Sequence, residues 1–164
     1  MSEHQILIVG SGDVATALES IGITLGWKPV VATSLSDVTS RLPATESVIV
    51  LSHDDQLDGP ALAAALTSNA SYIGAMGSRR TQARRRDWLL TNGVSAELAD
   101  SIRGPAGLDI GARTPAEIAV SIIAEIVACH RGATAADALS ARPGPIHPDA
   151  TPGSISCPGD TTTP

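Results

Sequence analysis

The sequence predicts a small doubly wound α/β fold, a Rossmann-like parallel sheet with helices on both faces. Short apolar segments alternate with longer segments of helical character along the first 130 or so residues. The apolar segments are continuous rather than alternating with polar residues, as in strands that are buried on both faces. A glycine-rich turn, "VGSGDVA", directly follows the first of them. Together these observations favour parallel strands joined by helical crossovers.

The predicted strands are four short apolar runs, Gln5–Val9, Pro29–Thr33, Ser47–Leu51 and Tyr72–Met76. Crossovers between parallel strands should be right-handed. We expect the first and fourth strands to be neighbours at the point where the strand order reverses. Ligands of such sheets bind beyond the carboxyl ends of the strands at this point.

The predicted helices are Val14–Leu25, Leu35–Arg41, Pro60–Thr67, Arg79–Thr91, Ala96–Ile102 and a last helix that begins at Pro115. Pro60 suits the first position of its helix, and Asp58 is a candidate cap for it. The last helix has the clearest start. Thr114 as N-cap and Glu117 three residues later form a capping box, and Gly132 ends the helix.

Composition separates residues 1–140, the predicted cofactor-binding domain, from residues 141–164. The second segment is rich in Pro, Gly, Ser and Thr, which predicts a flexible tail or an arm on a neighbouring surface.

The formal net charge of −6 argues against general nucleic-acid or membrane-surface binding. No apolar run has the length of a membrane span, and no secretory signal precedes the first strand. Cys129 and Cys157 lack CxxC spacing, as in reduced thiols of a cytoplasmic protein.

The glycine turn predicts a phosphate site. Gly10, Gly12 and Ala15 match the pattern G-x-G-x-x-(G/A), in which the glycines permit a tight turn and a close approach of backbone to phosphate. We expect Gly10, Gly12 and Asp13 to contact one phosphate at the helix start, where backbone amides favour an anion. The alternative is a tight turn that serves only packing.

An ordinary NAD site is not favoured, because the second predicted strand ends without an acidic residue. Asp or Glu normally binds the ribose hydroxyls there, but Thr33 or Ser34 occupies this place. Asp37 follows three or four residues later, on a predicted helix. A different phosphate-bearing ligand would suit the glycine turn equally well.

A second anion contact is predicted after the fourth strand, in "GAMGSRRTQARRR". Ser78 is the candidate N-cap, so that Arg79 and Arg80 would be the first helical residues. Cations in the first helical turn oppose the helix dipole, whereas a bound anion would reverse this effect. We therefore expect Gly77, Ser78, Arg79 and Arg80 to bind a phosphate.

The other arginines of this helix have simpler interpretations. Arg84 can pair with Asp87 at the i+3 position. Arg85 and Arg86 are interpreted as solvent-exposed charges that favour solubility.

Three segments together resemble the carboxyl-terminal Rossmann-type domain of the xanthine dehydrogenase accessory proteins, the XdhC/CoxI family. They are "VIVLSHDDQLDGPAL", "YIGAMGSRRTQARR" and "GLDIGARTPAEIAVSIIAEIVA". The resemblance implies a cytoplasmic accessory protein that binds the molybdenum cofactor, protects it and aids its insertion into a molybdenum hydroxylase. It also implies a homodimer. Family members usually carry a further amino-terminal domain, so a separate protein that supplies this domain is a candidate partner.

The resemblance adds two pairs of candidate site residues. His53 and Asp54 match a His-Asp motif of the family and are candidate ligand contacts, whereas turn and cap roles are favoured for Asp55 and Asp58. Asp109 and Arg113 lie in another family motif. They either pair with each other or close one side of the cofactor pocket.

The sequence therefore favours a cofactor-binding chaperone over a catalyst. It shows no arrangement typical of covalent catalysis, and we expect no metal site. The expected ligand is molybdopterin or a nucleotide, with NAD(P) less favoured. One alternative function is a minimal NAD(P)-dependent oxidoreductase, and another is an interaction scaffold without a ligand.

Overall fold

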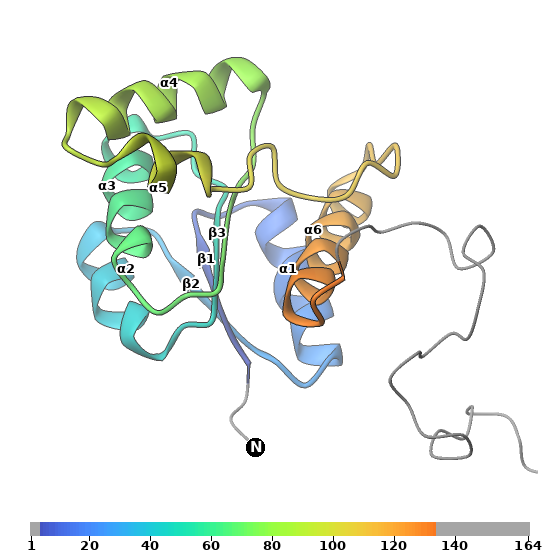
Figure 1. Cartoon of the computed structure of the whole chain (residues 1–164). Helices are drawn as coiled ribbons and strands as arrows, with labels where there is room; N and C mark the ends of the chain where they lie inside the picture. The colour runs from blue at the N-terminus through green and yellow to red at the C-terminus, as the bar shows by residue number, and fades with distance from the viewer. Residues whose placement is uncertain (1–3, 134–164) are drawn as a thin grey trace, which may run out of the picture. The chain divides into compact units, whose positions relative to one another are not determined.

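The computed structural model describes residues 4–133 of the chain, in which four parallel strands form one sheet. The strands are β1 (Gln5–Val9), β2 (Lys28–Ala32), β3 (Ser47–Val50) and β4 (Tyr72–Ala75), in the order β2-β1-β3-β4 (Figure 1). The predicted tail, residues 141–164, and Cys157 lie outside the described residues. The predicted doubly wound parallel fold is confirmed.

The predicted neighbour of the first strand is wrong. Leu7 of β1 lies opposite Val30 of β2 on one side and Val48 of β3 on the other, so β1 adjoins β3 rather than β4. β2 lies on one side of β1, and after β2 the chain passes β1 to form β3 on its other side. Because each crossover is right-handed, this change of side places the connecting helix, between β2 and β3, on the opposite face of the sheet from the helix between β1 and β2. The order of the strands therefore reverses between β1 and β3.

The helices and one short 3-10 turn are α1 (Asp13–Thr24), α2 (Leu35–Arg41), η1 (Leu42–Ala44), α3 (Asp55–Leu66), α4 (Arg79–Thr91), α5 (Ala96–Asp100) and α6 (Pro115–His130). In Figure 1, α1 and α6 cover one face of the sheet, while α2 and α3 cover the other. Among the described residues, no helix is long and apolar enough to cross a bilayer.

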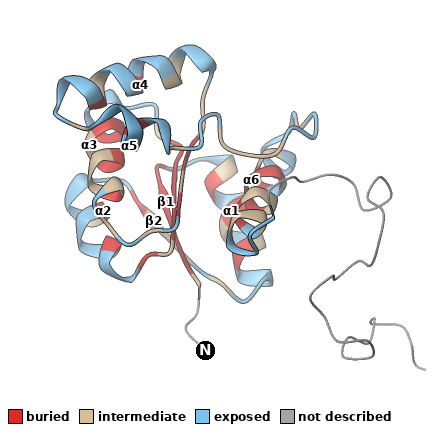
Figure 2. Cartoon of the chain, in the orientation of Figure 1, coloured by how far each residue is buried: buried red, intermediate tan, exposed pale blue. Residues whose placement is uncertain are grey.

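Side chains of one strand alternate between the two faces. Leu7 and Val9 of β1 belong to the apolar core beneath α2, α3 and α4. Ile6 and Ile8 belong to the core beneath α1 and α6. Figure 2 shows both cores as buried residues along the central strands and the inner faces of the helices. The continuous apolar character of β1 thus reflects burial on both sides.

Four predicted helix starts, at Leu35, Arg79, Ala96 and Pro115, are confirmed, and the start at Pro60 is wrong. The hydroxyl of Ser78 caps α4 by accepting a hydrogen bond from the Thr81 backbone. Thr114 and Glu117 form the capping box of α6. Helix α3, however, begins at Asp55 with Asp54 as its N-cap, so Pro60 lies inside the helix. Pro60 is the sixth residue of α3, beyond the first turn, so its missing N–H leaves the carbonyl of Gln56 without its usual helical donor.

Candidate functional site

Three loops meet at the carboxyl edge of the sheet, after β1, β3 and β4. The loop after β1 is pressed against the loop after β3 at Gly10, which has φ +117°. A Cβ atom at this position would lie 2.8 Å from the backbone nitrogen of Ser52. Only glycine fits both this conformation and this approach.

Gly12 leaves the start of α1 open. It is the N-cap of α1, with φ 115°, and no side chain of the described residues caps this helix. Gly12 and Asp13 are both exposed. First-turn amides without a partner attract an anion. The backbone N–H of Asp13 suits a phosphate, whereas its carboxylate would repel one.

His53 and Asp54 follow β3 at the same edge. Asp54 Oδ1 accepts a hydrogen bond from the Gln56 backbone N–H at 2.9 Å, which accounts for its place as N-cap of α3. His53 is exposed, and no hydrogen bond of its ring is found within residues 4–133. The structural role of Asp54 leaves its second carboxylate oxygen available.

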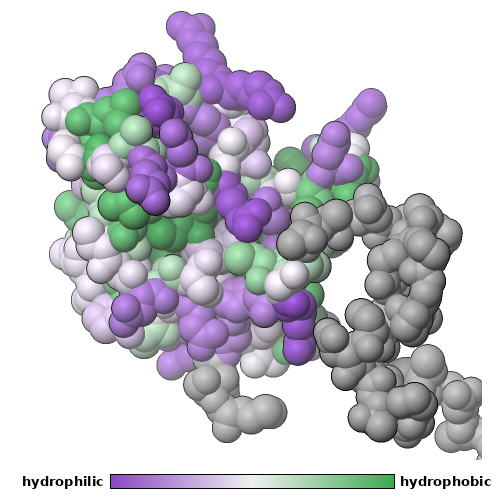
Figure 3. Space-filling model, viewed as in Figure 1, coloured by the Kyte–Doolittle hydropathy of each residue, from purple (hydrophilic) through white to green (hydrophobic). Residues whose placement is uncertain are grey.

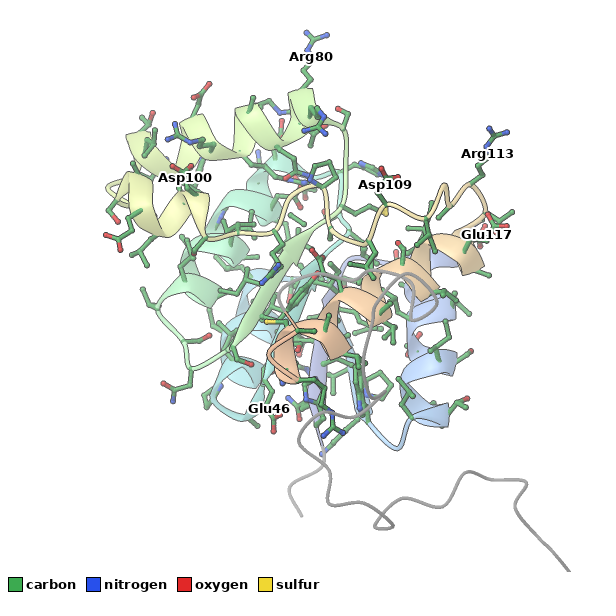
Figure 4. The ribbon with its side chains drawn as sticks, turned by 45° about the vertical axis from the view of Figure 1, so that its right-hand side comes forward. Glu46, Arg80, Asp100, Asp109, Arg113 and Glu117 are labelled. Atoms are coloured by element: carbon green, nitrogen blue, oxygen red, sulfur yellow. The ribbon has the colours of Figure 1, made fainter. Side chains whose placement is uncertain are left out.

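Arg79 and Arg80 occupy the first two positions of α4 and are exposed, as predicted. Within the described part of the chain, neither forms an ion pair. Figure 4 shows Arg80 extending away from the body of the domain at the start of α4. Gly77, before the cap, has φ +137° and brings the chain tightly past Thr81. The positive charge at this helix start is thus uncompensated by described residues.

Asp109 and Arg113 lie in the segment between α5 and α6. No ion pair joins them within residues 4–133, and in Figure 4 Arg113 extends outward while Asp109 lies nearer the centre of the domain. The Arg113 backbone N–H donates to Glu117 Oε2 at 2.8 Å, beside the Thr114 N–H at 2.9 Å. These two backbone donors hold the pKa of Glu117 below its ordinary value. The capping box therefore fixes the end of this segment.

Arg85 has a role that the sequence did not reveal. Its guanidinium is buried and contacts Asp58 Oδ2 through Nη2 at 2.6 Å and Nε at 3.0 Å. Arg85 also donates to the carbonyl of Met76 at 2.6 Å and to that of Ser52 at 3.0 Å. It therefore ties together the backbone after β3, the backbone after β4 and helix α3.

Several predicted roles of charged residues are corrected here. Arg85 is not a solubility residue, and Asp58 is its buried partner rather than a helix cap. Arg84 pairs with Asp55 at 2.9 Å instead of Asp87. Arg86 pairs with Asp100 at 2.6 Å. One signal for Arg85 was available, because it lies four residues before buried Leu89 and so shares its packing face.

A second polar cluster anchors the segment before α6. The Tyr72 hydroxyl donates to Glu125 Oε2 at 2.7 Å, and the Gly107 N–H donates to the same oxygen at 2.8 Å. Burial raises the pKa of Tyr72, and the Glu125 carboxylate raises it further. Arg103 lies 3.7 Å from Glu125 Oε1. This cluster joins β4, α6 and the segment that carries Asp109.

A hollow of about 240 Å³ lies between α3, α4 and α5. Leu62, Leu89 and Ile102 line it together with the Arg86–Asp100 pair. Figure 3 shows apolar surface on this side of the molecule. None of the predicted cofactor-binding residues lines this hollow. The candidate site is instead an exposed edge formed by loops.

Comparison with known proteins decides the family. The XdhC Rossmann domain matches residues 6–126. The chain belongs to this family. The predicted family resemblance is thereby confirmed over nearly the whole described domain.

Two curated proteins of Escherichia coli are similar in sequence to this XdhC Rossmann domain. The molybdenum cofactor insertion chaperone PaoD of Escherichia coli is 30% identical over 123 residues, which are 74% of this chain and 39% of PaoD. YqeB of the same organism, an uncharacterised protein, is 28% identical over 144 residues, covering 75% of this chain and 27% of YqeB. The chain thus spans well under half the length of these two curated relatives.

A solved structure supports the fold. It is a Bacillus halodurans protein described as a xanthine dehydrogenase, with 24% identity and a TM-score of 0.64. The match covers 84% of this chain and 45% of that protein. At this level of identity it shows the shared fold.

Proposed function

We propose that this XdhC Rossmann domain acts in the cytoplasm as an accessory protein in the maturation of a molybdenum hydroxylase such as xanthine dehydrogenase. It binds a phosphate-bearing cofactor, molybdopterin or a nucleotide, and protects it or aids its insertion. Membership of the XdhC family and the similarity to a molybdenum cofactor insertion chaperone support the accessory role. A homodimer is part of the same proposal.

One observation supports the phosphate site. Two helix starts at the same edge of the sheet both offer groups that favour an anion. Helix α1 begins at Gly12 without a side-chain cap. Helix α4 begins with Arg79 and Arg80, which are exposed and lack ion-pair partners among the described residues. Each arginine in the first turn would cost about 0.3–1 kcal/mol against the helix dipole. A bound phosphate would remove this cost.

The residues fit a phosphate group and divide its binding between them. Backbone amides at Gly12 and Asp13 would donate hydrogen bonds to the oxygens of one phosphate group. Ser78 and the guanidiniums of Arg79 and Arg80 would hold another, with forked hydrogen bonds. His53 and the free oxygen of Asp54 lie at the end of β3, within the same edge, and would contact the organic part of the ligand. Asp109 and Arg113 would close the side next to α6.

Ordinary NAD(P) is the weaker fit. Ser34, at the place where a ribose-binding acid is expected, caps α2 by accepting a hydrogen bond from the Asp37 backbone. The Asp37 carboxylate pairs with Arg41 at 2.7 Å. A minimal oxidoreductase would therefore have to bind the ribose without a carboxylate at the end of β2.

The experiment is calorimetric titration of the full chain with CTP, NAD, NADP and isolated molybdopterin. The double variant R79A/R80A should lower the affinity for the preferred ligand while leaving the melting temperature unchanged or higher. The control R41A/R131A removes two positive charges from the carboxyl-terminal ends of α2 and α6. It should bind the ligand as the parent chain does. Equal affinity of both double variants would contradict the phosphate site.

The ligand itself separates the candidate functions. Saturable binding of NAD or NADP with hydride transfer would replace the proposal by an oxidoreductase. Binding of none of the four ligands, with retained binding to a molybdenum hydroxylase, would indicate an interaction scaffold.

A further inference from the structure

The amino-terminal edge of the sheet gathers two histidines and a carboxylate from three distant parts of the chain. His4 immediately precedes β1, Glu46 immediately precedes β3, and His130 is the last residue of α6. Glu46 is labelled at this edge in Figure 4, opposite Arg80 and Asp109. Since α6 runs from the carboxyl edge back along the sheet, its last residue reaches the starts of β1 and β3.

The side chains of these residues converge. His4 Nδ1 lies 2.8 Å from Glu46 Oε2. The rings of His4 and His130 have centroids 4.4 Å apart in an edge-to-face arrangement. One ligand atom from each of His4, Glu46 and His130 can be chosen so that all three lie within 4.8 Å of one another.

Ser47 bridges the two histidine rings through their Nε2 atoms. Its hydroxyl oxygen lies 3.1 Å from Nε2 of His4 and 3.1 Å from Nε2 of His130. Trp27 packs against His4 in a tilted arrangement, with a centroid distance of 4.3 Å, and limits the movement of that ring. The donor atoms are therefore held close together by packing before any ion binds.

We propose that His4, Glu46 and His130 bind a zinc ion. Two imidazole nitrogens and one carboxylate oxygen form a donor set that zinc binds with an open fourth position. Zinc–ligand bonds of about 2.0–2.1 Å place tetrahedral ligand atoms about 3.3 Å apart. The candidate ligand atoms, which lie within 4.8 Å of one another, would have to move closer to reach this spacing. Water would fill the fourth position.

The ion would join the start of β1, the start of β3 and the end of α6. It lies at the edge opposite the proposed phosphate site, so the two proposals are independent. The sequence concealed this cluster because its members are widely separated and show no metal-ligand spacing. Only the packing of α6 along the sheet brings His130 to the other two.

The test uses the untagged full chain, freed of metal, at neutral pH. Zinc affinity is measured by competition with a chromophoric chelator and by calorimetry, and the Co²⁺ complex is examined by visible absorption. We expect one ion per chain, a tetrahedral Co²⁺ spectrum, and a zinc-dependent rise in melting temperature. The variants H130A and E46Q should each weaken zinc binding at least about tenfold.

The matched control is H53A/H147A, which removes the other two of the four histidines in the sequence. It should retain parent-like zinc affinity and the zinc-dependent rise in melting temperature. His130 is an exposed residue at a helix end, and circular dichroism without metal checks that H130A is folded. Absence of stoichiometric zinc binding by the parent chain would overturn the proposal. Equal zinc affinities of folded H130A and the parent would also overturn it.

Discussion

The guanidinium of Arg85 lies where three parts of the chain meet. Its pairing with Asp58 satisfies one charge with another, and its bonds to the Met76 and Ser52 carbonyls hold the loops after β4 and β3 together. Asp58 Oδ1 is buried without a hydrogen-bond partner among the described residues. Positioning of the two loops therefore depends on an ion pair that is incompletely satisfied.

Removal of Arg85 alone should be strongly destabilising. R85A would leave the Asp58 carboxylate buried and unpaired, which costs about 3–5 kcal/mol in the free energy of unfolding. The double variant D58L/R85M removes both charges and should recover most of this loss. Urea unfolding of the parent, R85M, D58L and D58L/R85M measures the coupling, with R85A measured beside them. A double variant as unstable as R85A would show that the backbone bonds, rather than the charge pairing, dominate.

The two glycines of the first turn should respond differently to alanine. At Gly10 an added Cβ meets the Ser52 backbone at 2.8 Å, so G10A requires the loops to separate. At Gly12 nothing lies within 4 Å of the added atom, and only the backbone conformation, with φ +115°, is strained. We expect G12A to cost about 1–3 kcal/mol and G10A to cost clearly more. Thermal unfolding of both variants checks this order, and the reverse order would contradict the loop contact.

At the scale of elements, α4 shows how one helix divides five arginines among different tasks. Arg79 and Arg80 face solvent at the helix start, while Arg85 is buried. Arg84 and Arg86 form exposed pairs with α3 and α5. Such exposed pairs contribute little to stability. The arginines of α4 therefore join this helix to its neighbours on two sides. At the helix start, their positive charge has no ion-pair partner among the described residues.

The start of α6 predicts a pH dependence. Because hydrogen bonds from the Thr114 and Arg113 backbone lower the pKa of Glu117 in the folded state, the ionised form stabilises the fold. This contribution is present above the unfolded-state pKa, about 4.3, and is lost as pH falls below it. E117Q should therefore reduce the loss of stability on acidification. Denaturant unfolding at pH 7 and pH 3 tests this, and identical pH profiles for variant and parent would contradict it.

At the scale of the whole molecule, the two sheet edges serve different purposes. The carboxyl edge carries the exposed loops and helix starts proposed to bind phosphate, and the amino edge carries the histidine cluster proposed to bind zinc. Between them, the apolar cores on both faces hold the strands in register. Binding at either edge would thus be supported by the same rigid sheet.

The buried Tyr72 should report on global unfolding at high pH. It is the only tyrosine in the sequence, and burial and Glu125 raise its pKa in the folded state. The unfolded chain ionises near pH 10, so stability falls as pH rises above that value. Tyrosinate absorbance should appear together with loss of circular dichroism, and Y72F should weaken the alkaline loss of stability. Ionisation of Tyr72 in the folded chain would contradict this.

Local patterns were enough to predict the fold class, the strands and most helix boundaries. Continuous apolar runs predicted β1 and β3, and the capping residues Ser78 and Thr114 predicted the starts of α4 and α6. These features depend on neighbours within a few residues, so the sequence carries them directly. The glycine turn and the start of α4 were also chosen from such patterns, whereas the family resemblance supplied the other candidate site residues. Contact of these residues with a ligand stays a prediction.

Tertiary structure alone decided the features that depend on contacts between distant segments. The position of β1 beside β3 is one such feature, because the sequence patterns do not specify on which side of β1 the chain returns after β2. The buried partner of Arg85 and the convergence of His4 with His130 depend on how helices pack across the sheet. The spacing of Arg85 to Leu89 indicated a packing face, but its partner Asp58 lies on another helix. A charge on a helix is expected to face solvent until another element packs over it, and the sequence does not specify which element that is.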